Sequence, residues 1–168
     1  MTLADLNQLA PAALQAELGK CCGARAWIAQ MSARFPFSSL AQVLAAAETV
    51  WFGCREQDWR EAFEHHPRIG DLNSLQEKYA GTRTWAAGEQ AGVHHASAEV
   101  LAQLARGNQE YEARFGYLFL VCATGKSAEE MLALLQARLP NAPEAEIKIA
   151  MAEQNKITKI RLTKLLSP

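Results

Sequence analysis

The sequence predicts an all-α protein, a single compact bundle-like domain. Apolar residues recur at three- and four-residue steps through most of the chain, as they do on the buried face of a helix. Ser, Thr, Pro and Gly stand where helices begin and end. The continuous apolar run at residues 117–123 could be a strand or a buried piece of helix, but no second convincing strand could pair with it. No internal repeat or low-complexity tract interrupts the pattern, so we expect one domain over residues 1–168.

The first helices are marked by their end residues. Thr2 can cap a short opening helix, and Pro11 suits the first turn of a second helix that fades near Gly23. Residues 24–34 form a third helix, which stops before Pro36.

A core helix follows, capped by Ser38 or Ser39 and closed by Gly53. Its apolar residues lie at helical steps: Leu40, Val43, Leu44, Ala47, Val50 and Trp51. Residues 56–65 form the next helix, which Pro67 ends.

The middle of the chain is less regular. Residues 72–79 predict a helix before Gly81, and residues 85–92 contain helix formers weakened by glycines.

Three stronger helical signals complete the chain. Ser97 caps a long amphipathic helix that runs toward Gly116. Ser127 and Glu130 have capping-box spacing ahead of a helix that Pro140 ends, and the last helix begins near Pro143.

Composition excludes several classes of protein. Hydrophobic residues make up 49% of the chain and charged residues 21%, as in ordinary soluble globular proteins. A formal net charge of -1 offers no electrostatic reason to expect nucleic acid or an anionic membrane as a partner. The four cysteines have no C-x-x-C spacing and no secretory signal precedes them, so we expect free thiols and a cytoplasmic location.

His66 is the first candidate for chemistry. It directly precedes Pro67, which disfavours the helical conformation of the residue before it, so the imidazole is held where a helix must stop. An imidazole titrates near neutral pH and can act as a general acid or base. Taken alone, the pair also fits a surface histidine that caps a helix.

Arg161 is the second candidate. At ~100° per residue it falls within the apolar stripe of the last helix, formed by Ile147, Ala150, Met151, Ile157 and Leu165. A guanidinium on that face needs a carboxylate, backbone carbonyls or an anionic ligand. A buried salt bridge, or a side chain whose head reaches water, explains the position equally well.

Glu89 and Gln90 are the third candidate, on a segment of small residues that a ligand could approach closely. A carboxylate beside a carboxamide can bind several N–H and C=O groups of a polar heterocycle. A solvated helix face is the simpler interpretation of the pair alone.

Together these features resemble one family, the 2-oxo-4-hydroxy-4-carboxy-5-ureidoimidazoline (OHCU) decarboxylases, which form (S)-allantoin in urate breakdown. The resemblance covers nearly the whole chain. It rests on the order and spacing of His66-Pro67, Glu89-Gln90, residues 111–116 with the apolar run after them, Arg138-Leu139 with Asn141, and Ile160-Arg161-Leu162.

The resemblance implies the roles of individual residues. His66, not His65, is the acid/base, and Glu89 and Arg161 orient the substrate and balance charge. The substrate-binding positions are Pro67, Ala86, Gly88, Gln90, Phe119, Leu120, Val121, Cys122 and Ala123. It also implies a reaction without a cofactor, which fits the lack of a dinucleotide or phosphate loop, and suggests a homodimer.

One position departs from the family pattern. Ala86 stands where the family often has Ser, so a hydroxyl contact with the substrate is lost. Water or Gln90 replaces that contact, or binding is weaker.

Two other functions stay open. A metal-dependent hydrolase could use the pairs His65-His66 and His94-His95, although neither pair has the i, i+4 spacing of helical zinc motifs. A non-catalytic helical interaction module would need an exposed apolar helix face, whereas the apolar residues here are spread over many helices.

Overall fold

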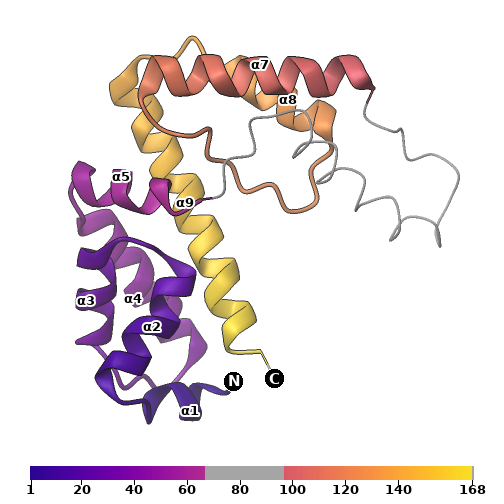
Figure 1. Cartoon of the computed structure of the whole chain (residues 1–168). Coiled ribbons are helices and arrows are strands. Elements are labelled where there is room, and N and C mark those ends of the chain that lie inside the picture. The colour runs from indigo at the N-terminus through magenta and orange to yellow at the C-terminus, as the bar shows by residue number, and fades with distance from the viewer. Residues whose placement is uncertain (67–96, 168) are drawn as a thin grey trace, which may run out of the picture. The chain divides into compact units, whose positions relative to one another are not determined.

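A computed structural model of the chain describes residues 1–66 and 97–167, and these residues form eight helices and no strand (Figure 1). The all-α prediction is confirmed. The helices are α1 (Leu3–Asn7), α2 (Pro11–Cys21), α3 (Arg25–Ser32), α4 (Leu40–Gly53), α5 (Glu56–Glu64), α7 (Ala98–Phe115), α8 (Ala128–Arg138) and α9 (Pro143–Leu165). The helical segments expected at 72–79 and 85–92 lie outside the described residues.

Local capping chemistry sets several helix starts. The hydroxyls of Thr2, Ser97 and Ser127 accept backbone N–H groups in the first turns of α1, α7 and α8. The Glu130 carboxylate in turn accepts the Ser127 N–H, so the expected capping box is formed. Each such cap stabilises its helix by about 1 kcal/mol.

The sequence allows either Ser38 or Ser39 to cap α4, and in the structure Ser39 is the N-cap. Its hydroxyl accepts the N–H of Gln42 at 3.3 Å. The Ser38 hydroxyl instead donates to the Gln42 side chain at 2.8 Å. Both serines therefore stabilise the first turn through Gln42, Ser39 by binding its backbone N–H and Ser38 by binding its side chain.

The contacts divide the chain into two compact units. Among the described residues, the first unit comprises Met1–His66, Leu120–Cys122 and 148–167, and the second comprises 97–119 and Ala123–Ile147. The expectation of one continuous domain over residues 1–168 stays a prediction.

Two buried tryptophans tie the first unit together. The indole N–H of Trp27 on α3 donates to the carbonyl of Ala47 on α4 at 3.0 Å. That of Trp51 on α4 donates to the carbonyl of Met151 on α9 at 2.8 Å. A buried indole needs such a partner, so the first bond fixes α3 against α4 and the second fixes α9 against α4 at Met151. The residues of α9 that follow Met151 are thereby positioned.

In the second unit, α7 and α8 pack closely around a buried polar cluster. A Cβ at Gly107 would lie 2.6 Å from Leu135 Cδ2, so any larger residue there would require the Leu135 side chain to shift. The fully buried Glu146 carboxylate receives Arg138 Nε at 2.8 Å and the Tyr111 hydroxyl. Removing one member of a buried charged cluster costs about 3–5 kcal/mol, because the partner's charge stays buried.

The apolar run at 117–123 is neither strand nor helix. Gly116 ends α7 at a φ of 75°, which redirects the chain out of the helix. The N–H of Cys122 then donates to the Glu153 carboxylate at 2.7 Å, so a side chain supplies the acceptor that a neighbouring strand would have offered. Within the segment only Tyr117 and Leu120 are buried, and the Tyr117 ring packs edge-on to that of Tyr111 at 5.9 Å between ring centroids.

Candidate functional site

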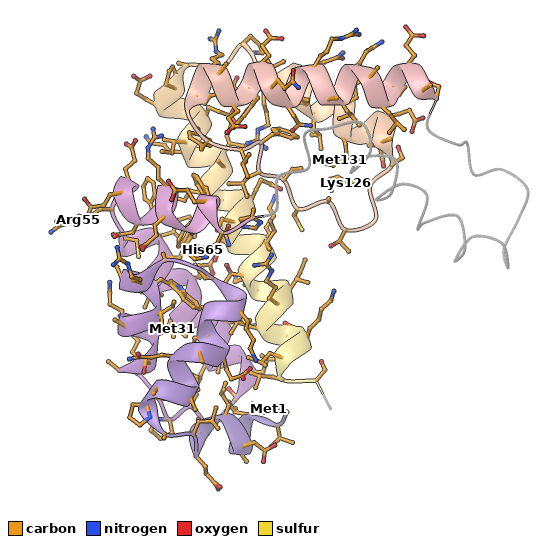
Figure 2. All side chains as sticks on the ribbon, in the orientation of Figure 1. Met1, Met31, Arg55, His65, Lys126 and Met131 are labelled. Carbon is orange, nitrogen blue, oxygen red and sulfur yellow. The ribbon has the colours of Figure 1, made fainter. Side chains whose placement is uncertain are left out.

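His66 lies directly after the C-terminal end of α5. His65 is the C-cap, as its place at the end of this helix in Figure 2 shows, and the His66 N–H donates to the carbonyl of Phe63 at 3.2 Å. The His66 side chain is half-buried, and its Nε2 lies 2.5 Å from Oε1 of Gln154 on α9. The ring is therefore held by a contact with a distant helix as well as by its own turn.

The surroundings of His66 favour the neutral imidazole. Burial lowers the pKa of His66 below its ordinary value of 6.5, and the charges of Arg161 and His65 lower this pKa further, while the bond to Gln154 opposes them. At neutral pH the ring can thus accept a proton, and it becomes an acid once it has done so.

Arg161 lies in the same unit as His66. Its guanidinium is half-buried and donates through Nη1 to the carbonyl of Cys21 at 3.5 Å, so a backbone carbonyl is one of its partners. The same charge acts on the pKa of His66 and of the Cys21 thiol. His66 and Arg161, two of the three predicted catalytic groups, therefore lie in one unit, and the charge of Arg161 acts on His66.

The predicted substrate-binding segment is held to α9 at Cys122. Leu120, Val121 and Cys122 belong to the unit that contains His66, and the Cys122 N–H is fixed by Glu153. Phe119 and Ala123 belong to the second unit.

Within the second unit, the Phe119 ring packs in the polar cluster. The Arg138 guanidinium lies 4.7 Å from its centroid, and the Tyr111 ring meets it edge-on at 5.1 Å.

The other predicted site residues lie outside the described residues. They are Pro67, Ala86, Gly88, Glu89 and Gln90.

Sequence patterns alone did not point to three polar residues of α9 that make contacts at this site: Glu153, Gln154 and Thr158. Gln154 is 1% exposed and Thr158 is 2% exposed, and both lie at four-residue steps between the buried Ala150 and Leu162. Because Gln154 and Thr158 are polar, they do not count toward the apolar stripe by which the buried face of α9 was predicted. A polar pair at core positions of a helix was the available signal, since buried polar groups need partners.

The described part of the chain shows no further candidate site built from thiols or metal-ligating side chains. Residues 1–66 and 97–167 contain no group of three His, Cys, Asp or Glu side chains that could hold a metal ion, and His94 and His95 lie outside these ranges. The four cysteines are free, and burial raises the pKa of Cys22 to about 12. In the same ranges, no helix combines the length and apolarity needed to cross a bilayer.

The described geometry suits proton transfer beside an anion-binding group. A neutral imidazole can exchange a proton, and a guanidinium recognises carboxylates through paired hydrogen bonds. Backbone groups of a segment outside regular structure can bind polar atoms of a ring directly.

Comparison with known proteins agrees with this picture. The chain is 36% identical over 148 residues to the uric acid degradation bifunctional protein of Arabidopsis thaliana, covering 88% of this chain and 45% of that protein. It is 21% identical over 168 residues to the 2-oxo-4-hydroxy-4-carboxy-5-ureidoimidazoline decarboxylase of Haloferax volcanii, covering 99% of this chain and 97% of that one. The chain spans less than half the length of several curated relatives that it matches along most of its own length, the Arabidopsis protein among them.

A solved structure also matches. The crystal structure of an OHCU decarboxylase in the presence of (S)-allantoin has a TM-score of 0.73 and 35% sequence identity, covering 90% of this chain and 98% of that one. The family profile for OHCU decarboxylase matches residues 7–163. The chain therefore belongs to the OHCU decarboxylase family.

Proposed function

We propose that this protein decarboxylates OHCU to (S)-allantoin in urate degradation, without a metal or organic cofactor. The observation that carries the proposal is that one unit of the chain holds both a half-buried imidazole, His66, whose lowered pKa favours the neutral form, and a guanidinium, Arg161, whose charge acts on that imidazole, in a chain that matches this family over residues 7–163.

The substrate supplies its own electron sink. Its carboxylate and hydroxyl share one ring carbon next to a ring C=N bond. When the bond to the carboxylate breaks, carbon dioxide leaves, the electron pair forms a double bond to the neighbouring ring carbon, and the C=N electron pair passes to the nitrogen, which takes up a proton. The enol then loses its hydroxyl proton and becomes the ring carbonyl of allantoin, while a proton is added to the neighbouring carbon, which bears the ureido arm. Delivery of that proton from one face yields a single enantiomer.

His66 is the proton-transfer residue in this proposal. It assists removal of the hydroxyl proton or delivers the proton to the ureido-bearing ring carbon, and its lowered pKa keeps the base form available at neutral pH. Arg161 and Glu89 orient the polar groups and balance the developing charge.

The remaining contacts follow the family resemblance. Gln90 and main-chain groups of residues 119–123 hold the ring and the ureido arm, with Pro67, Ala86 and Gly88 lining the same site.

The decisive experiment generates OHCU in situ from urate with upstream enzymes and follows the optical activity of the allantoin formed. His66→Ala should abolish the rate enhancement while the far-UV circular dichroism is kept. His65→Ala is the matched control, because it removes a neighbouring imidazole at the exposed C-cap, and it should stay within a few-fold of the parent. Near-normal turnover by folded His66→Ala contradicts the role of His66.

Arg161 should contribute to binding and to stability, because its guanidinium reaches the carbonyl of Cys21. Arg161→Ala should therefore lower both substrate affinity and the midpoint of thermal unfolding. Full activity in this variant would remove Arg161 from the site.

Ala86 tests the one departure from the family pattern. Ala86→Ser should keep or improve activity by restoring a hydroxyl contact. A marked fall in affinity would show that the site is organised differently here.

We further infer a cytoplasmic location and a homodimer. Light scattering of the purified protein, with a mass twice that of the 18.5 kDa chain as the expected result, tests the second inference.

A further inference from the structure

We infer that Gln154 is a positioning residue that fixes the tautomer of His66, so that Nδ1 is the ring nitrogen that exchanges a proton with the substrate. The role given to Nδ1 rests on the proposed function of His66, whereas the tautomer itself is a property of the protein alone.

The Gln154 carboxamide is held at both ends. Its Oε1 lies 2.5 Å from Nε2 of His66, and its Nε2 donates to the Thr158 hydroxyl at 3.1 Å. Gln154 is 1% exposed and Thr158 is 2% exposed, so bulk water does not compete for these groups. A buried amide bonded at both ends is held in place, and which end faces His66 depends on what each partner can donate or accept.

The surroundings of Thr158 favour its hydroxyl as the acceptor of the Gln154 N–H. The Thr158 hydroxyl also acts to lower the pKa of the fully buried Cys22 thiol, as a hydroxyl that donates toward the sulfur does, although burial raises this pKa overall. A hydroxyl carries one proton and two lone pairs, so it can donate toward the sulfur and accept the N–H of Gln154. Thr158, Gln154 and His66 then form a continuous chain of hydrogen bonds.

The acid/base cycle selects the same orientation. When the imidazole is protonated, both ring nitrogens carry protons, so the atom that faces Nε2 must be an acceptor. A Gln154 amide turned to present its N–H groups would face a second N–H at that stage. With Oε1 toward the ring, Nε2 keeps its proton in both states, and Nδ1 alone gains and loses one.

A neutral acceptor suits the charges around the ring. Arg161 on α9 and His65 at the end of α5 both disfavour protonation of His66, and burial acts in the same direction. A carboxamide orients Nε2–H without adding a negative charge, so the ring remains a base at neutral pH. A carboxylate at position 154 would orient the ring equally but stabilise the imidazolium.

The test combines NMR with kinetics. Histidine-selective ¹⁵N NMR of the ligand-free protein, with His66 assigned from the spectrum of His66→Ala, should show the Nε2–H tautomer at pH 8. Gln154→Met keeps the side-chain length but lacks the acceptor, so it should give a mixture of tautomers. Thr158→Val, which frees the Gln154 amide, should shift the same population less.

The kinetic arm separates positioning from structural support. Gln154→Met should lower kcat about tenfold or more while KM stays within about threefold, since a placed acid/base contributes about 10²–10⁴-fold. Gln154→Glu should keep the tautomer and move the acidic limb of the pH profile upward by about one unit or more. A merely structural role would not produce this shift.

Asn155→Met is the matched control. Asn155 is also buried on α9, but its side chain donates to Glu48 at 3.0 Å and makes no bond to His66. This variant should lose stability yet keep the His66 tautomer and the pH profile. An Nδ1–H tautomer in the parent protein, or an unchanged tautomer in Gln154→Met, would overturn the inference. Failure of the parent protein to decarboxylate OHCU defeats the proposed function alone, because the NMR result still decides what Gln154 does.

Discussion

The carboxylate of Glu153 accepts the backbone N–H of Cys122 at 2.7 Å, across 31 residues of chain. The next residue on α9, Gln154, bonds to His66, so one turn of a single helix contacts both the predicted substrate-binding segment, at Cys122, and the imidazole. The other Glu153 oxygen receives the exposed Lys156 amine at 2.5 Å.

Glu153→Ala should loosen the segment that contains Cys122. A hydrogen bond to a charged group is worth about 1.5–3 kcal/mol, so we expect KM for OHCU to rise about tenfold or more. Glu153→Gln keeps an acceptor and should stay within about threefold. Lys156→Ala removes only an exposed ion pair and should leave KM unchanged. An unchanged KM in Glu153→Ala would show that this bond does not order the site.

The pH dependence of kcat/KM should have an acidic limb below pH 6.5. Burial and the neighbouring charges lower the pKa of His66, so the base form persists to a more acidic pH than in an ordinary histidine. The sign for stability is the same: the folded state binds this proton less readily than the unfolded state, so stability is complete above the ordinary pKa and falls as the pH drops through the lowered value. Kinetics from pH 5 to 8 and urea unfolding over the same range measure both effects. An acidic limb above 6.5 would contradict this assignment.

Gly23→Ala should reduce activity more than it reduces stability. A Cβ at Gly23 would overlap the His65 ring, lying 2.7 Å from His65 Cβ, so the turn that holds His66 must shift. We expect kcat to fall about tenfold, because small displacements of a positioned group are costly.

Gly53→Ala is the control for this substitution. Nothing lies within 4 Å of a Cβ at Gly53, which closes α4, so this change should be neutral or stabilising by about 0.4–1 kcal/mol. Equal kinetics for the two alanine variants would mean that the turn at His65 tolerates movement.

Tyr111→Phe should destabilise the protein by about 1–3 kcal/mol, measured by urea unfolding. The substitution removes the hydroxyl that donates to the fully buried Glu146 carboxylate and leaves that charge with fewer donors. Thr163→Ala, at an exposed position on α9, should change the free energy of unfolding by less than about 0.5 kcal/mol. A loss of similar size in both variants would show that the cluster contributes little.

The start and end residues of helices were accessible from sequence because capping is local chemistry. Thr2, Ser97 and Ser127 cap helices where expected, Pro11 opens α2, and Gly116 ends α7. Residues 117–123 could not be assigned in this way, because an apolar run fits a strand or a helix and its outcome depended on an acceptor from Glu153. The expectations for Glu89 and its neighbours remain predictions.

By itself, the sequence determined the all-α class, most helix limits and the choice of His66 and Arg161 as candidates. The tertiary structure alone decided that Gln154 meets His66, 88 residues away in the chain, and that Thr158 holds the other end of that amide. Periodicity reports which helix face is apolar, so it passes over a polar side chain whose burial depends on a partner from another part of the chain.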